Sequence, residues 1–429
     1  MNIVMLTNTY LPHVGGVARS VAAFTAEYRR QGHRVLVVAP EFEKQPPNEE
    51  DVVRIPAIQH FNGSDFSAVL PVSGLLNTEL DNFKPDIVHS HHPYLLGMTA
   101  MRIARFRQLP LVFTHHTLYE QYTHYVPVDS PAFRRFVIEL ATRYANLSDQ
   151  VFAPSESIAK LLHERGTTAP VTVIPTGIKL SDFSNADGGR VRARLGIPDN
   201  AFVVGHLGRL APEKNLEFLA TAIARFLKNN AGAHFILAGE GPSAGPVREI
   251  LSREGVLGQL HDIGIVKHPE LADTYAAMNV FAFASTSETQ GMVLTEAMAA
   301  GVPVVGIDAT GVREVIRDEY NGRLLQESTV DDFVAALQWV SASDSKTREA
   351  LHTAALATAE KFSMERTAGS ALACYEKLIA QGAAARAEEY GSWESTMNLV
   401  KTEWDIIQGL AAATGAAIRG NDQSGSMPL

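Results

Sequence analysis

Residues 280–305, VFAFASTSETQGMVLTEAMAAGVPVV, carry the pattern that decides the fold class. The segment starts with a short apolar run of the kind that forms a buried parallel strand. A polar loop follows with Glu288 and Gly291, and then a short helical stretch carries Glu296 and ends at Gly301. A second apolar run closes the segment. Strand, loop, helix and strand in this order are the repeating unit of an α/β domain with a parallel sheet.

The same alternation extends over most of the chain and breaks once, at the turn-rich stretch 181–190. We therefore expect two doubly wound, Rossmann-like α/β domains, 1–178 and 179–385, that face each other across an inter-domain cleft. Open α/β sheets bind ligands beyond the carboxyl ends of their strands, which places the expected site in that cleft. The predicted strands are 3–6, 35–39, 86–89, 111–114, 150–153, 171–174, 202–206, 234–238, 280–283 and 302–306.

The end of the chain departs from this alternation. Apolar residues recur at spacings of three and four between Trp393 and Leu410, which predicts an amphipathic helix over about 390–412. Because no strand stands beside it in the sequence, we expect this helix to pack back on the first domain. Residues 413–429 are small and polar, and we expect a disordered tail there.

The composition excludes several classes of protein. Of 429 residues, 46% are hydrophobic and 20% charged, and the net charge of −10 opposes binding of nucleic acid. The single cysteine, Cys374, excludes an internal disulfide framework and a cysteine-based metal site. The sequence starts without a signal-peptide pattern and has no apolar run of about 18 residues. We therefore expect a cytoplasmic protein, with peripheral binding to the inner face of the cell membrane left open.

Two glycine-containing turns stand where strands lead into helices. Gly15 and Gly16 precede the first helix, where close approach of the backbone and the helix N-terminus favour an anion. In the second domain, Gly208 leads into a turn with Arg209 and Lys214, and a diphosphate would satisfy both charges. The residues alone leave alternatives to anion binding open. Gly15 and Gly16 could form a plain tight turn, and Arg209 and Lys214 could be two solvated surface charges.

The loop and helix after residue 284 hold two carboxylates. Glu288 and Glu296 stand eight residues apart, which suits binding of the hydroxyls of two sugars better than a proton-sharing pair. The backbone amides of Gly291, Met292 and Val293 would face an anion at the start of the helix. Solvated carboxylates are the alternative, although the apolar flanks indicate a buried helix, and buried carboxylates need partners.

Three motifs in the same order resemble those of one enzyme family. They are the segment 288–305, the stretch GRLAPEKN at 208–215, and IPTGI at 174–178. They are similar to the motifs of the retaining GT-B glycosyltransferases of family 4, and the resemblance covers roughly residues 1–380. Thr176 stands where that family usually has asparagine.

The resemblance implies roles for the residues of the two glycine-containing turns. Arg209 and Lys214 would hold the diphosphate of a nucleotide sugar, beside Gly208. Gly16, next to Gly15, would touch the same diphosphate from the first domain. The leaving nucleotide gains negative charge in the transition state, so preorganised cations and amides act where that charge develops.

The resemblance also implies roles around the two carboxylates. Glu296 would bind the nucleotide ribose, and Glu288 the hydroxyls of the donor sugar with help from the backbone of Gly291–Leu294. His116, after the fourth predicted strand, would contact the donor sugar near the reacting carbon. No carboxylate nucleophile is visible for a double displacement. Retention of the configuration at the reacting sugar carbon then fits front-face attack, in which the leaving phosphate accepts the proton of the acceptor.

Two further stretches point to a subgroup of the family. FTHHTLYEQY at 113–122 and SETQG at 287–291 resemble the bacterial and plant enzymes that glucosylate diacylglycerol. We therefore expect a hexosyltransferase that moves glucose from UDP-glucose to 1,2-diacylglycerol with an α-glycosidic link. GDP-mannose as donor, and a soluble sugar, a glycan or a phosphatidylinositol-type lipid as acceptor, are alternatives. A sugar-nucleotide epimerase and a non-catalytic binding module are alternatives of other classes.

A lipid acceptor requires a surface that reaches the membrane. Residues 1–178 carry 15 basic and 16 acidic side chains, against 22 and 31 in the remainder, so the first domain is the less acidic one. Its residues Tyr119, Tyr122, Arg134 and Arg135 are those that we expect at the membrane or the acceptor. An ordinary helix with solvated arginines is the alternative for the last two.

Metal ions and cofactors are not part of this expectation. Ten of the fifteen histidines precede residue 170, and a zinc or iron cluster is the alternative at two strand ends that hold several of them. Polar residues are expected at such ends in any α/β fold, so we expect no metal site. The nucleotide sugar is a substrate, and a divalent cation could raise activity without being required. The sequence does not indicate an oligomeric state.

Overall fold

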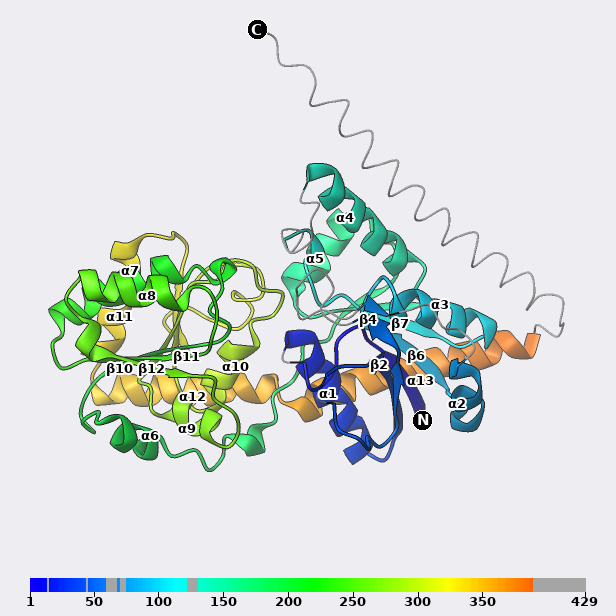
Figure 1. The fold of residues 1–429 in the computed structure, drawn as a ribbon, viewed down its shortest axis with the longest axis horizontal. Coiled ribbons are helices and arrows are strands. Elements are labelled where there is room, and N and C mark those ends of the chain that lie inside the picture. The colour runs from blue at the N-terminus through cyan, green and yellow to red at the C-terminus, as the bar shows by residue number, and fades with distance from the viewer. Residues whose placement is uncertain (14, 44, 59–67, 70–74, 122–129, 389–429) are drawn as a thin grey trace, which may run out of the picture. The chain divides into compact units, whose positions relative to one another are not determined.

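Two compact units make up the chain. The computed structural model describes residues 1–388 except 14, 44, 59–67, 70–74 and 122–129 (Figure 1). Unit 1 combines Met1–Thr176 with the residues from Thr367 on, and unit 2 is Gly177–Arg366. Each unit is built on its own parallel sheet. None of the helices in the described part of the chain combines the length and the apolarity needed to span a bilayer.

Unit 1 has a seven-stranded sheet in the order β3-β2-β1-β6-β7-β8-β9, and all its pairings are parallel. The strands are β1 (Asn2–Leu6), β2 (Arg34–Pro40), β3 (Val52–Ile55), β6 (Ile87–Ser90), β7 (Leu111–Thr114), β8 (Gln150–Ala153) and β9 (Val171–Val173). A separate antiparallel pair joins β4 (Ala57–Ile58) to β5 (Ala68–Val69). The helices are α1 (Gly16–Arg30), α2 (Leu75–Phe83), α3 (Leu96–Phe106), α4 (Pro131–Asn146), α5 (Glu156–Glu164) and α13 (Met364–Glu388).

Unit 2 has a six-stranded parallel sheet in the order β12-β11-β10-β13-β14-β15. The strands are β10 (Val203–Leu207), β11 (His234–Ala238), β12 (Leu260–Gly264), β13 (Val280–Phe283), β14 (Val304–Ile307) and β15 (Gly322–Leu325). The helices are α6 (Gly188–Leu195), α7 (Leu216–Asn229), α8 (Ala244–Arg253), α9 (Glu270–Ala276), α10 (Met292–Ala299), α11 (Val330–Ala342) and α12 (Ser345–Lys361).

Apolar side chains fill both faces of each central sheet region. In unit 2, helices α7, α8 and α11 cover one core cluster, and α6, α9, α10 and α12 contribute to another (Figure 1). The central strands β6, β7, β8 and β13 are buried over their whole length. Burial on both faces explains why these strands are continuous apolar runs in the sequence and not alternating ones.

The structure confirms the doubly wound α/β architecture, but it adds three parallel strands that the sequence analysis missed. They are β3, β12 and β15, and each lies at an edge of its sheet. Edge strands are less enclosed, and most residues of these three are only half-buried. Polar residues such as Arg54, Asp262 and Arg323 therefore interrupt the apolar runs by which the other strands were recognised.

The division of the chain differs in part from the expected one. The first boundary falls after Thr176, close to the expected 178. We expected 179–385 to form the second domain, whereas the residues of α13 from Thr367 on belong to unit 1. The expected helix over about 390–412 and the tail 413–429 lie outside the described residues.

Packing of α13 explains this correction. Tyr375 of α13 is fully buried, and its ring packs against Tyr28 of α1 and Phe152 of β8. A helix without a neighbouring strand in sequence can cover any sheet that offers an apolar face. The periodicity of residues 364–385 shows that a helix forms, but not which sheet it covers.

Candidate active site

Two loops of unit 2 follow the carboxyl ends of neighbouring strands in its sheet. The neighbouring strands β10 and β13 pair in parallel through Gly205 and Phe281, so their carboxyl ends point the same way. One loop leads from β10 into the 3-10 turn η5 (Pro212–Lys214), and the other leads from β13 to α10. The hydroxyl of Ser287 in the second loop donates to the carbonyl of Glu213 in the first, at 3.2 Å. This hydrogen bond holds the two loops together.

Lys214 and Glu288 form an ion pair across these loops. Nζ of Lys214 lies 2.5 Å from Oε1 of Glu288, and the two side chains are 18% and 16% exposed. We expected Lys214 at the diphosphate and Glu288 at the sugar hydroxyls, and the structure brings the two side chains into contact. An ammonium group has three N–H donors, so Lys214 can keep Glu288 and still donate to an anionic oxygen.

Arg209 pairs with Glu213, the residue before Lys214. Nη2 of Arg209 donates to Oε1 of Glu213, and the arginine side chain is 51% exposed. No described residue hydrogen-bonds to the buried Oε2 of Glu213. The sequence analysis missed Glu213. Its spacing of four from Arg209, typical of ion pairs within a helical turn, was the available signal.

The turn before α10 depends on glycine. Gly291 has a φ of +71°, and a Cβ there would stand 2.9 Å from Cδ1 of Leu294. The first turn of α10 has no acidic residue, and no side chain caps it. The amides of Met292 and Val293 therefore stand at the positive end of the helix dipole, where an anion is favoured.

Glu296 lies on the buried part of α10. Its carboxylate accepts a hydrogen bond of 2.8 Å from the hydroxyl of Tyr275 on α9, and the residue is 5% exposed. This bond offsets part of the cost of burying a carboxylate. The motif identified Glu296 but not Tyr275, because the contact joins two helices that are separated by a strand.

A neutral histidine lies beside the ion pair. Nδ1–H of His206 on β10 donates to the carbonyl of Ala282 at 2.9 Å, and no described residue hydrogen-bonds to its buried Nε2. The pKa of His206 is lowered to about 4, mainly by burial, which the Ala282 hydrogen bond opposes; the Lys214 charge also lowers it and Glu288 raises it. His206 is therefore uncharged at pH 7. The sequence analysis did not single it out.

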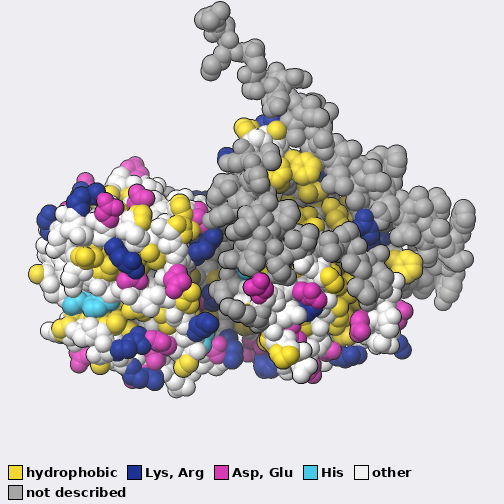
Figure 2. All heavy atoms as spheres, in the orientation of Figure 1, with side chains coloured by type: hydrophobic (Ala, Val, Ile, Leu, Met, Phe, Trp, Pro, Cys, Tyr) yellow, Lys and Arg dark blue, Asp and Glu magenta, His cyan; other side chains and the backbone are white. Residues whose placement is uncertain are grey.

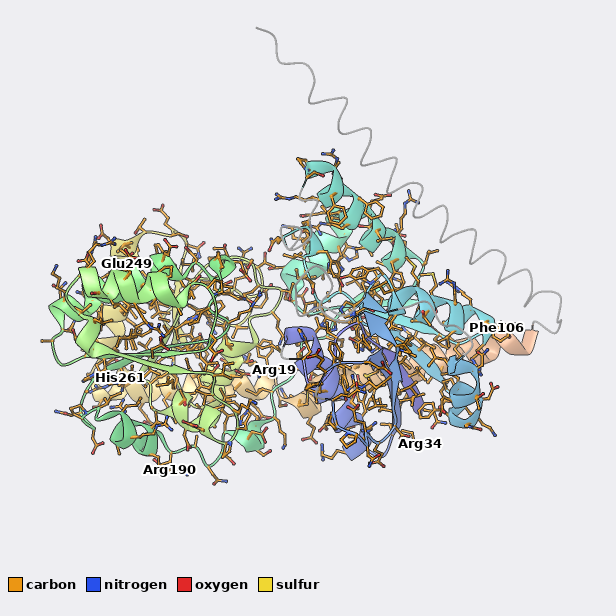
Figure 3. All side chains as sticks on the ribbon, viewed as in Figure 1. Arg19, Arg34, Phe106, Arg190, Glu249 and His261 are labelled. Atoms are coloured by element: carbon orange, nitrogen blue, oxygen red, sulfur yellow. The ribbon has the colours of Figure 1, made fainter. Side chains whose placement is uncertain are left out.

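The loop after β1 in unit 1 ends at the start of α1. Gly15 is the N-cap, with a φ of −159° and no side-chain cap, and α1 begins at Gly16. The first turn has no acidic residue, and it carries the exposed Arg19 (Figure 3). A helix start of this kind favours an anion, as expected for Gly15 and Gly16.

Arg54 of β3 holds the same loop. Its Nη2 donates to the carbonyl of Leu11 at 2.6 Å, and its Nη1 to the carbonyl of Pro40 at 2.9 Å. The guanidinium pairs with Glu49 at 2.7 Å and stands over the ring of Tyr10. The sequence analysis missed Arg54, because its strand was not recognised.

His116 pairs with a second histidine. His116 follows β7, His91 follows β6, and Nε2 of the first lies 2.9 Å from Nδ1 of the second. Burial lowers the pKa of His116 to about 3 and holds that of His91 well below its usual range. Both imidazoles are neutral at pH 7, and of two facing nitrogens one must donate and the other accept. Each ring therefore restricts the tautomer of the other.

Three more histidines complete a buried cluster around this pair: His89, His92 and His115. Burial lowers the pKa of His92 and of His115 to about 3. Neither ring nitrogen of His115 has a hydrogen-bond partner among the described residues. Within the same residues, no group of three His, Cys, Asp or Glu side chains could hold a metal ion.

Tyr119 lies inside this region. It begins the 3-10 turn η2 (Tyr119–Gln121), its ring contacts Tyr94 and His115, and its hydroxyl is buried. We expected Tyr119 in a membrane-facing loop, but packing against the histidine cluster keeps its hydroxyl from a membrane surface. Tyr122 lies outside the described residues.

The two expected arginines stand at the beginning of α4. Ser130 caps this helix by accepting from the amide of Phe133. Arg134 is exposed and Arg135 half-buried, and the half-buried rings of Phe133 and Phe136 stack with centroids 6.2 Å apart. The start of α4 thus combines cations with accessible apolar area.

Two family patterns cover most of the chain. The pattern described as Glycosyltransferase Family 4 matches residues 14–182, and the one described as Glycosyl transferases group 1 matches residues 189–357. The first segment falls almost wholly in unit 1 and the second in unit 2.

Proteins of similar sequence transfer sugars. The alpha-monoglucosyldiacylglycerol synthase of Streptococcus pneumoniae is 30% identical over 338 residues, which are 76% of this chain and 75% of that protein. The enzyme of the same name from Acholeplasma laidlawii is 30% identical over 71% of this chain and 80% of its own. A GDP-mannose-dependent alpha-mannosyltransferase of Mycobacterium tuberculosis is 28% identical over 79% of this chain and 88% of its own.

Solved structures share the fold. A sucrose-phosphate synthase from Thermosynechococcus elongatus aligns with a TM-score of 0.72 and 20% identity, over 88% of this chain and 99% of that one. HepE from Anabaena, in complex with UDP, aligns with a TM-score of 0.69 and 21% identity, over 88% and 100%. The two units therefore have the GT-B fold.

Substitution of the ion pair tests the donor site. We expect Lys214→Ala and Glu288→Gln each to lower turnover of the nucleotide sugar by orders of magnitude, because charge-assisted contacts in a transition state contribute about 2–4 kcal/mol. Melting temperatures should change little. Arg225→Ala is the matched control, since it removes an exposed, ion-paired cation from the same unit. Wild-type turnover in either site variant would place the donor elsewhere.

The buried histidines predict that unit 1 loses stability in mild acid. Their folded pKa values lie below the unfolded value of about 6.5, so below that pH the unfolded chain binds protons that the folded unit excludes. Between pH 7.5 and 5.5, each of His92, His115 and His116 should lower the free energy of unfolding by about 1 kcal/mol. Urea unfolding at both pH values measures the difference, and equal stabilities would contradict the prediction.

Proposed function

The chain belongs to the glycosyltransferases that join a family 4 domain to a group 1 domain, and we propose that it transfers glucose from UDP-glucose to 1,2-diacylglycerol with an α-glycosidic link. The donor diphosphate is proposed to bind beside Arg209, Lys214 and the start of α10, beyond the carboxyl ends of strands β10 and β13. This combination of two cations and a helix N-terminus carries the proposal, because it suits a dianionic group.

The names of the relatives support glucose and diacylglycerol. Two relatives at 30% identity are alpha-monoglucosyldiacylglycerol synthases. A relative at 28% identity is a GDP-mannose-dependent mannosyltransferase, which makes GDP-mannose the second candidate donor. A soluble sugar, a glycan or a phosphatidylinositol-type lipid is the second candidate acceptor.

In the proposed reaction, the acceptor hydroxyl attacks the front face of the donor sugar. Lys214, Arg209 and the first amides of α10 stabilise the charge that develops on the leaving diphosphate. Glu288, oriented by its bond to Lys214, accepts hydrogen bonds from hydroxyls of the sugar. The neutral His116 hydrogen-bonds to the sugar without adding charge. A phosphate oxygen accepts the proton of the acceptor, and no bound cofactor takes part.

The remaining expected residues bind the rest of the donor in this proposal. Glu296 accepts from the ribose, and Tyr275 holds its second oxygen in place. Gly15 and Gly16 approach the diphosphate with the start of α1, and Arg54 keeps their loop in position.

We propose that the protein binds peripherally to the inner face of the cell membrane. It would reach the acceptor there through the start of α4. Arg134, Phe133 and Phe136 offer one exposed cation and two accessible rings, the combination that binds anionic lipid surfaces. On α3, Phe106 also points outward and is 58% exposed (Figure 3). The visible face of unit 2 mixes acidic and basic side chains (Figure 2). Residues 1–178 carry 15 basic and 16 acidic side chains, against 22 and 31 in the remainder, which favours unit 1 as the docking unit.

Labelled donors test the reaction and its class. With radiolabelled UDP-glucose and vesicles that contain diacylglycerol, we expect the label to move into the organic extract. In calorimetry, we expect UDP to bind more tightly than GDP. Tighter binding of GDP than of UDP would make GDP-mannose the proposed donor in place of UDP-glucose. Label recovered only in another nucleotide sugar would indicate an epimerase, and label in a water-soluble product a soluble acceptor.

Charge reversal tests the membrane surface. The double variant Arg134→Glu, Arg135→Glu should bind anionic vesicles more weakly in flotation and lose activity on vesicle-embedded lipid, while its affinity for UDP stays the same. The control is Arg143→Glu, an ion-paired arginine near the other end of the same helix. Full activity of the double variant would remove this surface from the proposal.

A further inference from the structure

A chain of hydrogen bonds runs through the core of unit 1 to the histidine cluster. The hydroxyl of Tyr28 on α1 donates to that of Tyr375 on α13 at 3.2 Å, and the Tyr375 hydroxyl lies 2.6 Å from Nδ1 of His89. Nε2 of His89 lies 2.6 Å from Oγ1 of Thr114, the last residue of β7. All four residues are buried.

The ionisation states of these groups fix the direction of the bonds. Burial holds the pKa of His89 well below its usual range and raises that of Tyr375, so the first is neutral and the second protonated at pH 7. The single proton of the Tyr375 hydroxyl is directed to Nδ1 of His89, because that contact, at 2.6 Å, is shorter than the 3.2 Å contact with Tyr28. A neutral imidazole that accepts at Nδ1 carries its proton on Nε2, which donates to Thr114.

His89 reaches His116 by two routes. The ring centroid of His89 lies 4.2 Å from that of His91, and Nδ1 of His91 is the partner of Nε2 of His116. Thr114, which accepts from His89, precedes His116 by two residues at the end of β7. A rotation of the His89 ring would therefore disturb both the partner of His116 and the strand end that carries it.

We propose that the hydroxyl of Tyr375 positions His116 for sugar transfer, acting through His89 and His91. The inference rests on the proposed function, in which His116 contacts the donor sugar. With Tyr375 as donor, His89 keeps one tautomer and one ring orientation. Without that hydroxyl, Nδ1 of His89 loses its donor, the ring is free to take its other tautomer, and the contact with His91 is no longer fixed.

The ring of Tyr375 has a separate role in packing. Its centroid lies 5.9 Å from that of Phe152 and 5.7 Å from that of Tyr28. Phenylalanine keeps both contacts, so Tyr375→Phe removes the hydroxyl alone. Tyr28→Phe is the matched control, because it removes a buried hydroxyl from the same place but no bond to a histidine.

The experiment combines kinetics with spectra of the imidazole nitrogens of the full-length protein, labelled with ¹⁵N-histidine. In Tyr375→Phe we expect the Nδ1 signal of His89 to lose the shift of a hydrogen-bonded acceptor, and the signals of His91 and His116 to move. We expect kcat to fall roughly tenfold, with the donor KM changed less than about twofold, since misorientation acts on the transition state. Tyr28→Phe should retain the kcat and the His91 and His116 signals of the unaltered protein.

Two results would overturn the inference. One is unchanged signals of His91 and His116 in Tyr375→Phe. The other is an equal loss of kcat in both phenylalanine variants, which would indicate looser packing instead of positioning. His116→Ala tests the premise separately. Full turnover in that variant would reject the proposed role of His116, while the spectra would still report whether Tyr375 orients the cluster.

Discussion

The parallel pairing of neighbouring strands is the constraint on which the candidate site depends. In unit 1, Ser90 of β6 pairs with Phe113 of β7, so the two strands end side by side. Paired strands lie about 4.8 Å apart, close enough for side chains just beyond them to touch. His91 and His116, 25 residues apart in sequence, form a hydrogen bond for this reason. In unit 2, the pairing of β10 with β13 brings Lys214 to Glu288 in the same way.

The residues beyond the carboxyl ends of the strands differ in their electrostatics between the two units. In unit 2, Arg209 and Lys214 each have a carboxylate partner, and both ion pairs keep some exposure to solvent. Such partly exposed cations can still donate to phosphate oxygens. In unit 1, burial keeps His91 and His116 neutral, so they hydrogen-bond without attracting a charge. The ion pairs of unit 2 therefore suit an anionic group, and the neutral histidines of unit 1 suit an uncharged hydrogen-bonding group.

The sequence predicted the parts of the site that local spacing encodes. Gly291 at a positive φ and Glu296 on the following helix both belong to one continuous motif, and the structure has them in the expected loop and helix. Tyr275 and Glu213 were missed because packing between separate elements selects them. Tyr119 was expected at the membrane or the acceptor as part of an aromatic-rich stretch, and nothing in the sequence indicated that its ring packs against Tyr94 and His115.

Tyr375 lies outside every motif because packing between separate elements, and not local spacing, brings it to the histidine cluster. The family pattern that matches unit 2 ends at residue 357, before α13 begins at Met364. Yet α13 continues into unit 1, where the hydroxyl of Tyr375 reaches His89. A helix with no strand beside it in sequence thus adds a hydrogen-bond donor to a core built from strands more than 200 residues earlier. The contact between this hydroxyl and Nδ1 of His89 thus joins the histidine cluster to a residue that local sequence patterns do not connect to it.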